Sequence, residues 1–427
     1  MVATIFVLVA IAPAAGTSDS EMQQVLANLR DGKFSDITAR LDERGKAAVS
    51  PARLEAAWNS STSGDGRLVS WDSIRDADLN GSDFKVFRLH FENGQTLLLE
   101  IGVNRSSGEI TDLLFHPDTA VAPATSPQYA VASNFYSLDV HVGSAPYELP
   151  GILTIPTNGK GPWPAVVMLG GSGPNDMDET IGPNHIFKDI AEGLSSRGIV
   201  VLRYSKRTLI YGKTMDAQHI TIKEEYLDDA VAAVNLLRSR SEVDKNRIFI
   251  AGHSLGATIA PEVALRAAPV QGLILLAPGG RKTGAAIVQQ MRFLGEASHQ
   301  QLDELERKAN ELDNHLMPPT ERFMNAPASY WYDLDARNEV ALARQLNVPI
   351  LILHGGRDYQ VIDKDIEHWQ EGLKGVAHVH VDTFPALNHL FIAGTGKPNN
   401  QEYLVPGHVD QQVIDAMSAF VENPLAN

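Results

Sequence analysis

The sequence predicts an α/β protein with a mostly parallel, doubly wound sheet, preceded by a small α+β domain. The chain has 427 residues, more than the roughly 100–200 residues of a usual domain, so two domains are expected. Residues 117–128 are rich in Pro, Ala and Thr and form the predicted linker. Before this linker strand-like runs follow one another, whereas after it strands and helices alternate, which is typical of a parallel sheet.

Residues 18–116 form the predicted α+β domain. Residues 18–29 begin with capping residues and carry apolar residues at helical spacing, and a second helix is expected at residues 51–58. The runs that follow are separated by Asn-Gly and Ser-Gly pairs, which are typical of hairpin turns. Strands are expected at residues 67–71, 83–92, 96–104 and 109–115. The domain is therefore predicted to be two helices followed by an antiparallel meander.

Residues 129–427 form the predicted doubly wound domain. Its later strands are continuous apolar runs such as AVVML, IFIA and PILIL, as expected of strands buried on both faces. Strands are expected at residues 133–142, 151–155, 165–169, 199–204, 247–251, 272–277, 348–354 and 378–384. Helices are expected at residues 186–197, 223–239, 255–267, 363–373 and 408–421. Residues 282–345 interrupt this alternation, and we expect them to form a cap over the functional site rather than a surface decoration.

The composition narrows the possible partners and cofactors. Apolar residues make up 44% and charged residues 21% of the chain, which is ordinary for a globular protein. The formal net charge of −16 disfavours nucleic acid and anionic membranes as partners. The absence of cysteine excludes disulfides, thiolate metal sites and a cysteine nucleophile. No His, Asp or Glu cluster has the spacing of metal ligands, so neither metal nor cofactor is expected.

Residues 1–15 are expected to be a signal peptide. The apolar run Val2–Ala12 is shorter than the about 20 residues that span a bilayer, and small residues at Ala12 and Ala14 suit signal peptidase. We therefore expect export to the periplasm or the medium, with no stable membrane insertion. No basic residue precedes the run, so a cytoplasmic location is the alternative.

The clearest chemical motif is Gly252-His253-Ser254-Leu255-Gly256, which lies between a predicted strand and a predicted helix. In the α/β-hydrolase fold a G-x-S-x-G motif forms a sharp turn that presents the serine hydroxyl above the sheet. The two glycines leave space for neighbouring backbone. The motif predicts Ser254 as a nucleophile, which needs a base to take its proton and a carboxylate to orient that base.

The acid and the base follow from the chain order of this fold, which is Ser, then Asp or Glu, then His. Asp358 follows the strand PILILHG, at the strand edge where catalytic groups gather. His389 follows the last strand. Asp363 and Asp365 are expected in the first turn of the next helix, where acidic residues favour the helix dipole. The remaining histidines near these strands are expected to be packing or surface groups: His253, His354, His378 and His380.

An oxyanion hole is expected beside the nucleophile. In this fold one donor is the N–H after the nucleophile, here that of Leu255, and the other comes from the loop after the third strand. That loop is Gly170–Pro174, in which Gly171 and Ser172 are both candidates. It lacks the G-x-x-x-x-G-K-[ST] and G-x-G-x-x-G patterns, which disfavours phosphate binding.

The catalytic half of the chain resembles bacterial carboxylesterases of the α/β-hydrolase superfamily that carry a small N-terminal accessory domain. The resemblance spans residue 133 to the C-terminus and rests on GGSGPNDMDETIGPNHIFKDIAEGLSSRGIVVLRYSKRT, GHSLGA, SYWYDL, HGGRDYQV and NHLF. It implies the same triad of Ser254, Asp358 and His389, and hydrolysis of short- to medium-chain carboxylic esters. Ala257 departs from a position that is often glycine. The first domain resembles accessory domains of the nuclear-transport-factor-like type.

The expected function is that of a serine carboxylesterase acting on a small-molecule ester. A serine peptidase, and an acyl-CoA thioesterase or acyltransferase, are alternatives on the same fold; a non-catalytic binding protein is a further one. Three roles are open for the first domain: it binds a ligand, it shields the site, or it mediates self-association into a homo-oligomer. Two groups of residues near the predicted site each have two possible roles. A basic group either faces a substrate carboxylate or forms ion pairs with Asp176, Asp178 or Glu179; it consists of Arg203, Lys206 and Arg207. Tyr330, Trp331 and Tyr332 line an acyl pocket or pack the cap onto the core.

Overall fold

The computed structural model describes residues 18–62, 65–79, 82–117, 126–212, 214–216, 218–267, 269–295, 298–324 and 326–425. These residues fall into two compact units, one before and one after the segment 118–125. The predicted signal peptide, residues 1–15, lies outside the described residues, as does most of the predicted linker. Within the described ranges no helix is long and apolar enough to cross a membrane.

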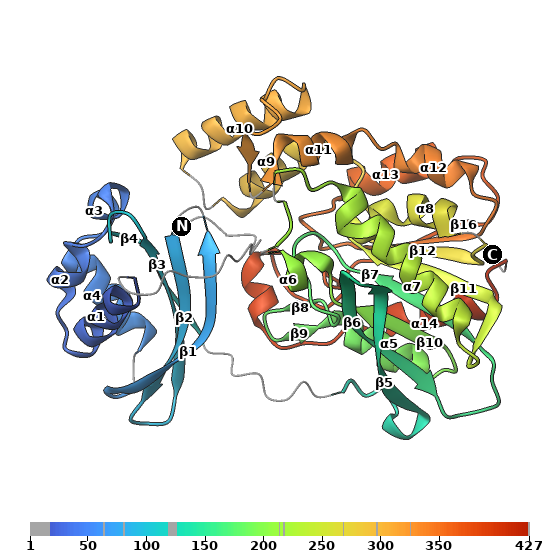
Figure 1. The fold of residues 1–427 in the computed structure, drawn as a ribbon, viewed down its shortest axis with the longest axis horizontal. Helices are drawn as coiled ribbons and strands as arrows, with labels where there is room; N and C mark the ends of the chain where they lie inside the picture. The colour runs from blue at the N-terminus through green and yellow to red at the C-terminus, as the bar shows by residue number, and fades with distance from the viewer. Residues whose placement is uncertain are drawn as a thin grey trace. The chain divides into compact units, whose positions relative to one another are not determined.

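The first unit has helices on one face of an antiparallel sheet (Figure 1). The sheet order is β1-β2-β3-β4, so the predicted meander is confirmed. Its core joins helix residues such as Met22 to strand residues such as Leu99. The elements are α1 (Ser18–Arg30), α2 (Phe34–Thr38), α3 (Glu43–Ala48), α4 (Pro51–Ser61), β1 (Leu68–Leu79), β2 (Ser82–Phe91), β3 (Thr96–Asn104) and β4 (Ile110–Pro117).

Two features of this unit differ from the prediction. The short helices α2 and α3 were not expected, because five or six residues give too little periodicity to recognise. Strand β1 continues to Leu79 rather than ending at Trp71. Its second half, DSIRDADL, is polar, but its backbone pairs with β2 up to Leu79 opposite Ser82. Pairing with a neighbouring strand has here outweighed local strand propensity.

The second unit is built on an eight-stranded sheet of order β16-β15-β12-β11-β7-β10-β6-β5. Every neighbouring pair is parallel except those that include β6, which runs against both β5 and β10. The predicted mostly parallel sheet is confirmed. Its strands are β5 (Phe135–Ser144), β6 (Tyr147–Pro156), β7 (Trp163–Leu169), β10 (Val200–Tyr204), β11 (Val243–His253), β12 (Gly272–Leu276), β15 (Ile350–Gly355) and β16 (Val379–Phe384).

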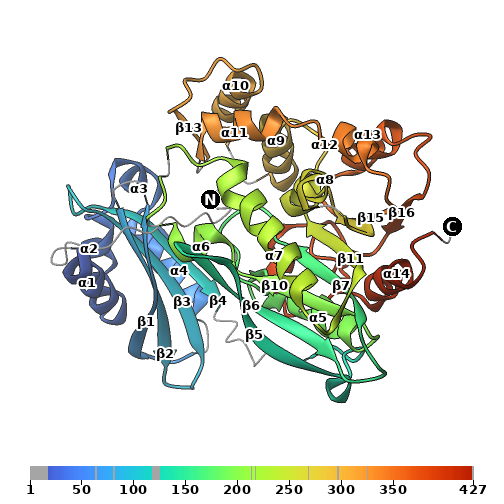
Figure 2. The same cartoon turned by 45° about the vertical axis from the view of Figure 1, so that its right-hand side comes forward.

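Helices cover both faces of this sheet (Figures 1 and 2). Helices α5 (Ile186–Ser195) and α14 (Gln411–Glu422) pack together on one face. Helices α7 (Asp228–Ser239) and α8 (Leu255–Ala267) lie on the other, together with α12 (Glu339–Gln345) and α13 (Asp363–Gly372). The helix predicted at residues 223–239 begins as a π-helical turn, Lys223–Leu227, before α7.

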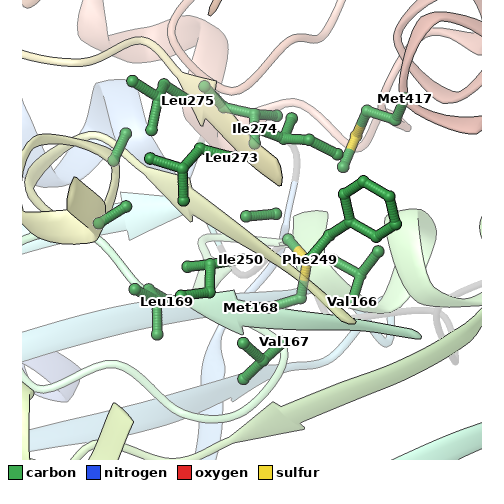
Figure 3. Close-up of a cluster of buried hydrophobic side chains, with 14 of the residues drawn as sticks. Val166, Val167, Met168, Leu169, Phe249, Ile250, Leu273, Ile274, Leu275 and Met417 are labelled. Carbon is green, nitrogen blue, oxygen red and sulfur yellow. The ribbon is translucent and has the colours of Figure 1, made fainter. Parts of the chain in front are cut away.

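The central strands form a dry core that fixes where their carboxyl ends lie. Figure 3 shows apolar side chains of β7, β11 and β12 packed together, with Met417 of α14 beside them. The ten labelled side chains are at most 1% exposed. Burying one such side chain contributes about 1.5–3 kcal/mol. Because the strands are parallel and in register, the loops that follow them emerge at one edge.

The region between β12 and β15 is an insertion with its own helices. It holds α9 (Thr283–Leu294), α10 (His299–Asp313) and α11 (Ala328–Asp335), and the two-residue strands β13 (Arg322–Phe323) and β14 (Ala326–Pro327). A small apolar cluster that includes Leu312 and Phe323 stabilises it. The insertion is linked to the sheet domain by Arg281, which pairs with Asp365 of α13. The elements outside these layers are β8 (Thr180–Ile181), β9 (Asn184–His185), α6 (Arg207–Tyr211), and the 3-10 turns Ala132–Asn134 and Asn400–Leu404.

Candidate active site

Ser254 stands on the tight turn between β11 and α8. Its φ of 53° lies in the left-handed region, which costs a non-glycine residue energy and is found at functional sites. The flanking glycines are required by close approach: a Cβ on Gly256 would lie 2.2 Å from the Leu169 carbonyl oxygen, and one on Gly252 would lie 2.3 Å from the Gly256 carbonyl. The residues of the G-x-S-x-G motif therefore pack against the strand end of β7.

Asp358 and His389 meet at the same edge of the sheet. Asp358 lies in the loop after β15 and His389 in the loop after β16, and these two strands are neighbours. Asp358 Oδ2 is 2.6 Å from His389 Nδ1. Asp358 Oδ1 accepts hydrogen bonds from the N–H groups of Gln360 (2.8 Å) and Val361 (3.0 Å). The carboxylate is thus held by its own loop and oriented toward the imidazole.

The other carboxylates that follow β15 have different partners. Asp363 Oδ1 is 3.1 Å from Nε2 of His354, a buried histidine at the end of β15. Asp365 is buried in the first turn of α13, where it accepts from Arg281 and from the Gly280 N–H. Only Asp358 among the three contacts His389 within the described structure.

The loop after β7 lies against the turn that carries Ser254. A Cβ on Gly171 would lie 3.3 Å from Ser254 Cβ and 2.8 Å from Glu179 Oε1, so a larger residue there would displace the Glu179 carboxylate. The Gly171 N–H donates to Glu179 Oε1 at 2.7 Å, in a buried contact. Leu255 is the first residue of α8, so its N–H has no acceptor within the helix. Of the three candidate oxyanion donors, the Gly171 N–H therefore already donates its hydrogen bond to a carboxylate.

Glu179 and His253 form a buried pair that links three loops, and the sequence did not predict this role. His253 Nδ1 is 3.0 Å from Glu179 Oε1, and its Nε2 is 2.9 Å from the carbonyl oxygen of His389. Both ring nitrogens face acceptors, which favours the doubly protonated imidazolium. Burial acts to lower the pKa of His253, but attraction and hydrogen bonding to Glu179, the hydrogen bond to His389 and attraction to Asp358 together outweigh it, so the pKa is raised. The rings of His253 and His389 are 4.7 Å apart.

Lys206 holds the other end of Gly171. Its buried ammonium donates to the Gly171 carbonyl oxygen (2.9 Å), to Glu225 Oε1 (2.6 Å) and to the Tyr226 hydroxyl oxygen (2.6 Å). The Tyr226 hydroxyl itself donates to the same carbonyl at 2.5 Å. Burial lowers the pKa of Lys206, although attraction to Glu225 opposes this effect. Three acceptors for three N–H groups fit a charged ammonium.

The other basic and aromatic residues for which the sequence allowed two roles make structural contacts. Arg203 pairs with Asp178 at 2.6 Å, which confirms the ion-pair alternative for this residue. Arg207 pairs with Asp229, a partner that the sequence did not indicate.

Tyr330 is buried in the main core and donates to Glu225 Oε2 at 2.5 Å. Trp331 and Tyr332 donate to backbone carbonyls of the insertion, those of Phe323 and Met317. His378 and His380 are exposed.

Among the described residues, no group of three or more His, Asp or Glu side chains is arranged to hold a metal ion.

The sheet order, the strained serine turn and the Asp–His pair together define a hydrolase of the α/β-hydrolase superfamily. A hydrolase family profile described as serine aminopeptidase, S33, matches residues 184–393, which include Ser254, Asp358 and His389. The chain is 38% identical over 412 residues to Esterase EstD of Thermotoga maritima, covering 95% of this chain and 96% of that protein. The chain is therefore an enzyme that belongs to the family of this esterase, as the sequence resemblance predicted.

Solved structures that match part of the chain include two esterases. Est1E from Butyrivibrio proteoclasticus is 18% identical, with a TM-score of 0.46, over 68% of this chain and 99% of that one. An esterase from Pyrobaculum calidifontis is 15% identical, with a TM-score of 0.46, over 68% of this chain and 87% of that one.

Proposed function

We propose that this enzyme is a serine carboxylesterase that cleaves short- to medium-chain carboxylic esters through an acyl-enzyme intermediate. The observation that carries the proposal is the 2.6 Å contact between Asp358 and His389 at the sheet edge where Ser254 stands on its strained turn. Full-length similarity to a protein named as an esterase supports the substrate class. The chain-length range rests on the sequence resemblance alone.

The proposed mechanism assigns proton transfer to His389, nucleophilic attack to Ser254 and orientation of the imidazole to Asp358. Asp358 accepts from His389 Nδ1, which leaves Nε2 as the nitrogen that takes the proton from the Ser254 hydroxyl. Ser254 attacks the ester carbonyl, and His389 then protonates the leaving alcohol. His389 then takes a proton from a water molecule, which attacks the acyl carbonyl, and it returns the proton to the Ser254 oxygen as the acid leaves. Asp358 stabilises the imidazolium that forms in both steps.

The proposed oxyanion hole consists of the N–H groups of Leu255 and Ser172. Gly171 and Ser172 were equal candidates from the sequence. The 2.7 Å bond from the Gly171 N–H to Glu179 favours Ser172 as the loop donor.

The insertion is proposed to cap the acyl side of the site. Phe293 of α9 stacks on Tyr359, the residue after Asp358, with ring centroids 5.4 Å apart and ring planes 2° from parallel. Tyr359 in turn stacks on Tyr403 at 6.0 Å. This aromatic column joins the insertion to the loop of the acid, and it is the proposed wall that limits acyl length.

Hydrolysis of p-nitrophenyl esters from acetate to palmitate tests the proposal. Wild type should prefer the shorter chains, and Ser254→Ala should lower kcat by about 10⁴-fold or more, since removal of a serine nucleophile leaves only binding and oxyanion stabilisation. The esterase proposal would be contradicted if the wild-type enzyme hydrolysed none of these esters, or if Ser254→Ala kept the wild-type rate.

A serine peptidase is the second candidate, because the matching family profile carries a peptidase description. The same preparation should be given aminoacyl p-nitroanilides. Turnover of these amides above that of the esters, and lost in Ser254→Ala, would favour the peptidase. The net charge of −16 disfavours acyl-CoA substrates, whose phosphates require basic partners.

A further inference from the structure

Three side chains donate hydrogen bonds to the carbonyl oxygen of Gly171. Lys206 Nζ lies 2.9 Å from its oxygen, the Tyr226 hydroxyl 2.5 Å and the Asn175 Nδ2 3.1 Å. Lys206 and Tyr226 are both buried, so these bonds are not weakened by water. The direction of this carbonyl is therefore set by side chains from three places in the sequence.

Fixing this carbonyl also fixes the next N–H. The Gly171 C=O and the Ser172 N–H belong to one planar peptide, and in the trans form they point in opposite directions. With the carbonyl turned toward Lys206, the Ser172 N–H points to the opposite side. Gly171 itself lies against the nucleophile, since a Cβ there would be 3.3 Å from Ser254 Cβ.

We propose that Lys206 is a positioning residue for the oxyanion hole. Its ammonium group holds the Gly171–Ser172 peptide so that the Ser172 N–H faces the oxygen on which negative charge develops. A cation on the carbonyl also polarises the peptide and strengthens the N–H as a donor, because hydrogen bonds in a chain reinforce one another. This inference rests on the proposed acyl transfer at Ser254.

The insertion takes part in this arrangement through Glu225. One oxygen of Glu225 accepts from Lys206 at 2.6 Å, and the other accepts from the Tyr330 hydroxyl at 2.5 Å. Tyr330 belongs to α11 of the insertion. The chain Tyr330–Glu225–Lys206–Gly171 therefore connects the proposed cap to the proposed oxyanion donor.

The test compares two neighbouring buried ion pairs. Lys206→Met with Glu225→Gln removes the cation on the loop without leaving its carboxylate unpaired. The matched control is Arg207→Met with Asp229→Asn, which removes a similarly buried ion pair. In that pair the arginine bonds Asp229 and lies over the ring of Tyr147, whereas Lys206 bonds the Gly171 carbonyl. Each protein is assayed for kcat and KM with the best p-nitrophenyl ester, and for inhibition by an alkyl trifluoromethyl ketone, whose serine adduct carries an oxyanion.

The Lys206 pair should lose about 10²-fold in kcat with KM within about threefold, as expected when an oxyanion donor is misplaced. The inhibition constant of the ketone should rise by a similar factor. The control should change kcat by less than about threefold. Equal losses in the two double variants, or a fall in kcat without weaker ketone binding, would overturn the inference.

Tyr226→Phe covers the case in which the Lys206 double variant does not fold. This change removes one donor to the Gly171 carbonyl and keeps Lys206 in place, so kcat and ketone affinity should fall together by about threefold to tenfold, the worth of one hydrogen bond. If Tyr226→Phe had the kcat and the ketone inhibition constant of the wild-type enzyme, the inference would be overturned. Wild type without activity on any ester would instead remove the proposed function.

Discussion

The two sides of the candidate site are held in place by different means. On the acid side, which carries the proposed triad acid, Asp358 is anchored by the backbone N–H groups of Gln360 and Val361, two and three residues further on. On the oxyanion side, next to the proposed oxyanion hole, Gly171 is held by Glu179 at its N–H and by Lys206 at its carbonyl. The first anchor is local backbone, whereas the second consists of buried charged side chains.

This difference has consequences for stability and pH dependence. Backbone donors come with the turn and carry no charge that must leave water. A buried carboxylate or ammonium loses hydration energy and is stable only with its partner, so removal of one member leaves an unpaired charge. The acid side should therefore respond to mutation in activity alone. The oxyanion side should respond in both activity and stability.

The largest expected effect comes from the acid side. Asp358→Asn keeps an oxygen for the two backbone N–H groups but no longer stabilises the His389 imidazolium, so kcat should fall by about 10⁴-fold. The thermal midpoint should stay within a few degrees of wild type. Ester kinetics and thermal denaturation on the same preparation check both parts. A drop of many degrees would show that this side also depends on its buried charge, and the contrast between the two sides would disappear.

An intermediate effect is expected from Glu179→Gln on the oxyanion side. Charge-assisted hydrogen bonds are about twice as strong as neutral ones, so weaker bonds to Gly171 and His253 should lower kcat by about tenfold. The groups that act on His253 are Glu179, Asp358 and the His389 loop. Asp178→Asn is the matched control, because it breaks the neighbouring ion pair with Arg203, which does not touch the loop.

The same variant predicts a change in pH dependence. The folded pKa of His253 is raised, so its stabilising contribution is complete below its ordinary pKa of about 6.5 and is lost as the pH rises through the folded value. Wild type should therefore exceed Glu179→Gln in thermal midpoint most at pH 6 and least at pH 9. Midpoints measured across this range test the sign. A difference that grows with pH would show that His253 is neutral in the fold.

The contrast between the two sides also explains what the sequence could predict. Ser254 directly follows β11, and Asp358 and His389 lie in the loops after β15 and β16; parallel strands bring such positions to one edge. The buried pairs have no such rule. His253 and Glu179 are 74 positions apart, and Tyr330 and Glu225 are 105 apart. The charged run YSKRT after the strand IVVLR was the one available indication, because charges that close to a buried strand need partners.

In the fold, prediction succeeded where a pattern was long. All eight strands of the main sheet were expected, since each is a run of five or more residues with a clear apolar face or core. The second half of β1 and the helices α2 and α3 were not, because pairing and packing partners distant in sequence decide them.

The smallest effect on activity should come from a buried charge that touches neither side. Glu339 at the start of α12 is 6% exposed, and neither of its carboxylate oxygens has a hydrogen-bond partner among the described residues. Burial and, to a lesser degree, repulsion from Glu262 raise the pKa of Glu339 to about 8, although Arg337 opposes this. A raised folded pKa means that stability is complete below about 4.5 and falls as the pH rises toward 8.

Glu339→Gln should therefore stabilise the protein at pH 8, by up to an amount on the order of 4 kcal/mol, and change little at pH 5. Urea unfolding at the two pH values measures this difference. The kcat of the variant should equal that of wild type at both, since α12 lies outside both anchors. If kcat changed as much as in Glu179→Gln, buried charge in general would affect catalysis. The oxyanion side would then owe its sensitivity to overall stability and not to its contacts with Gly171.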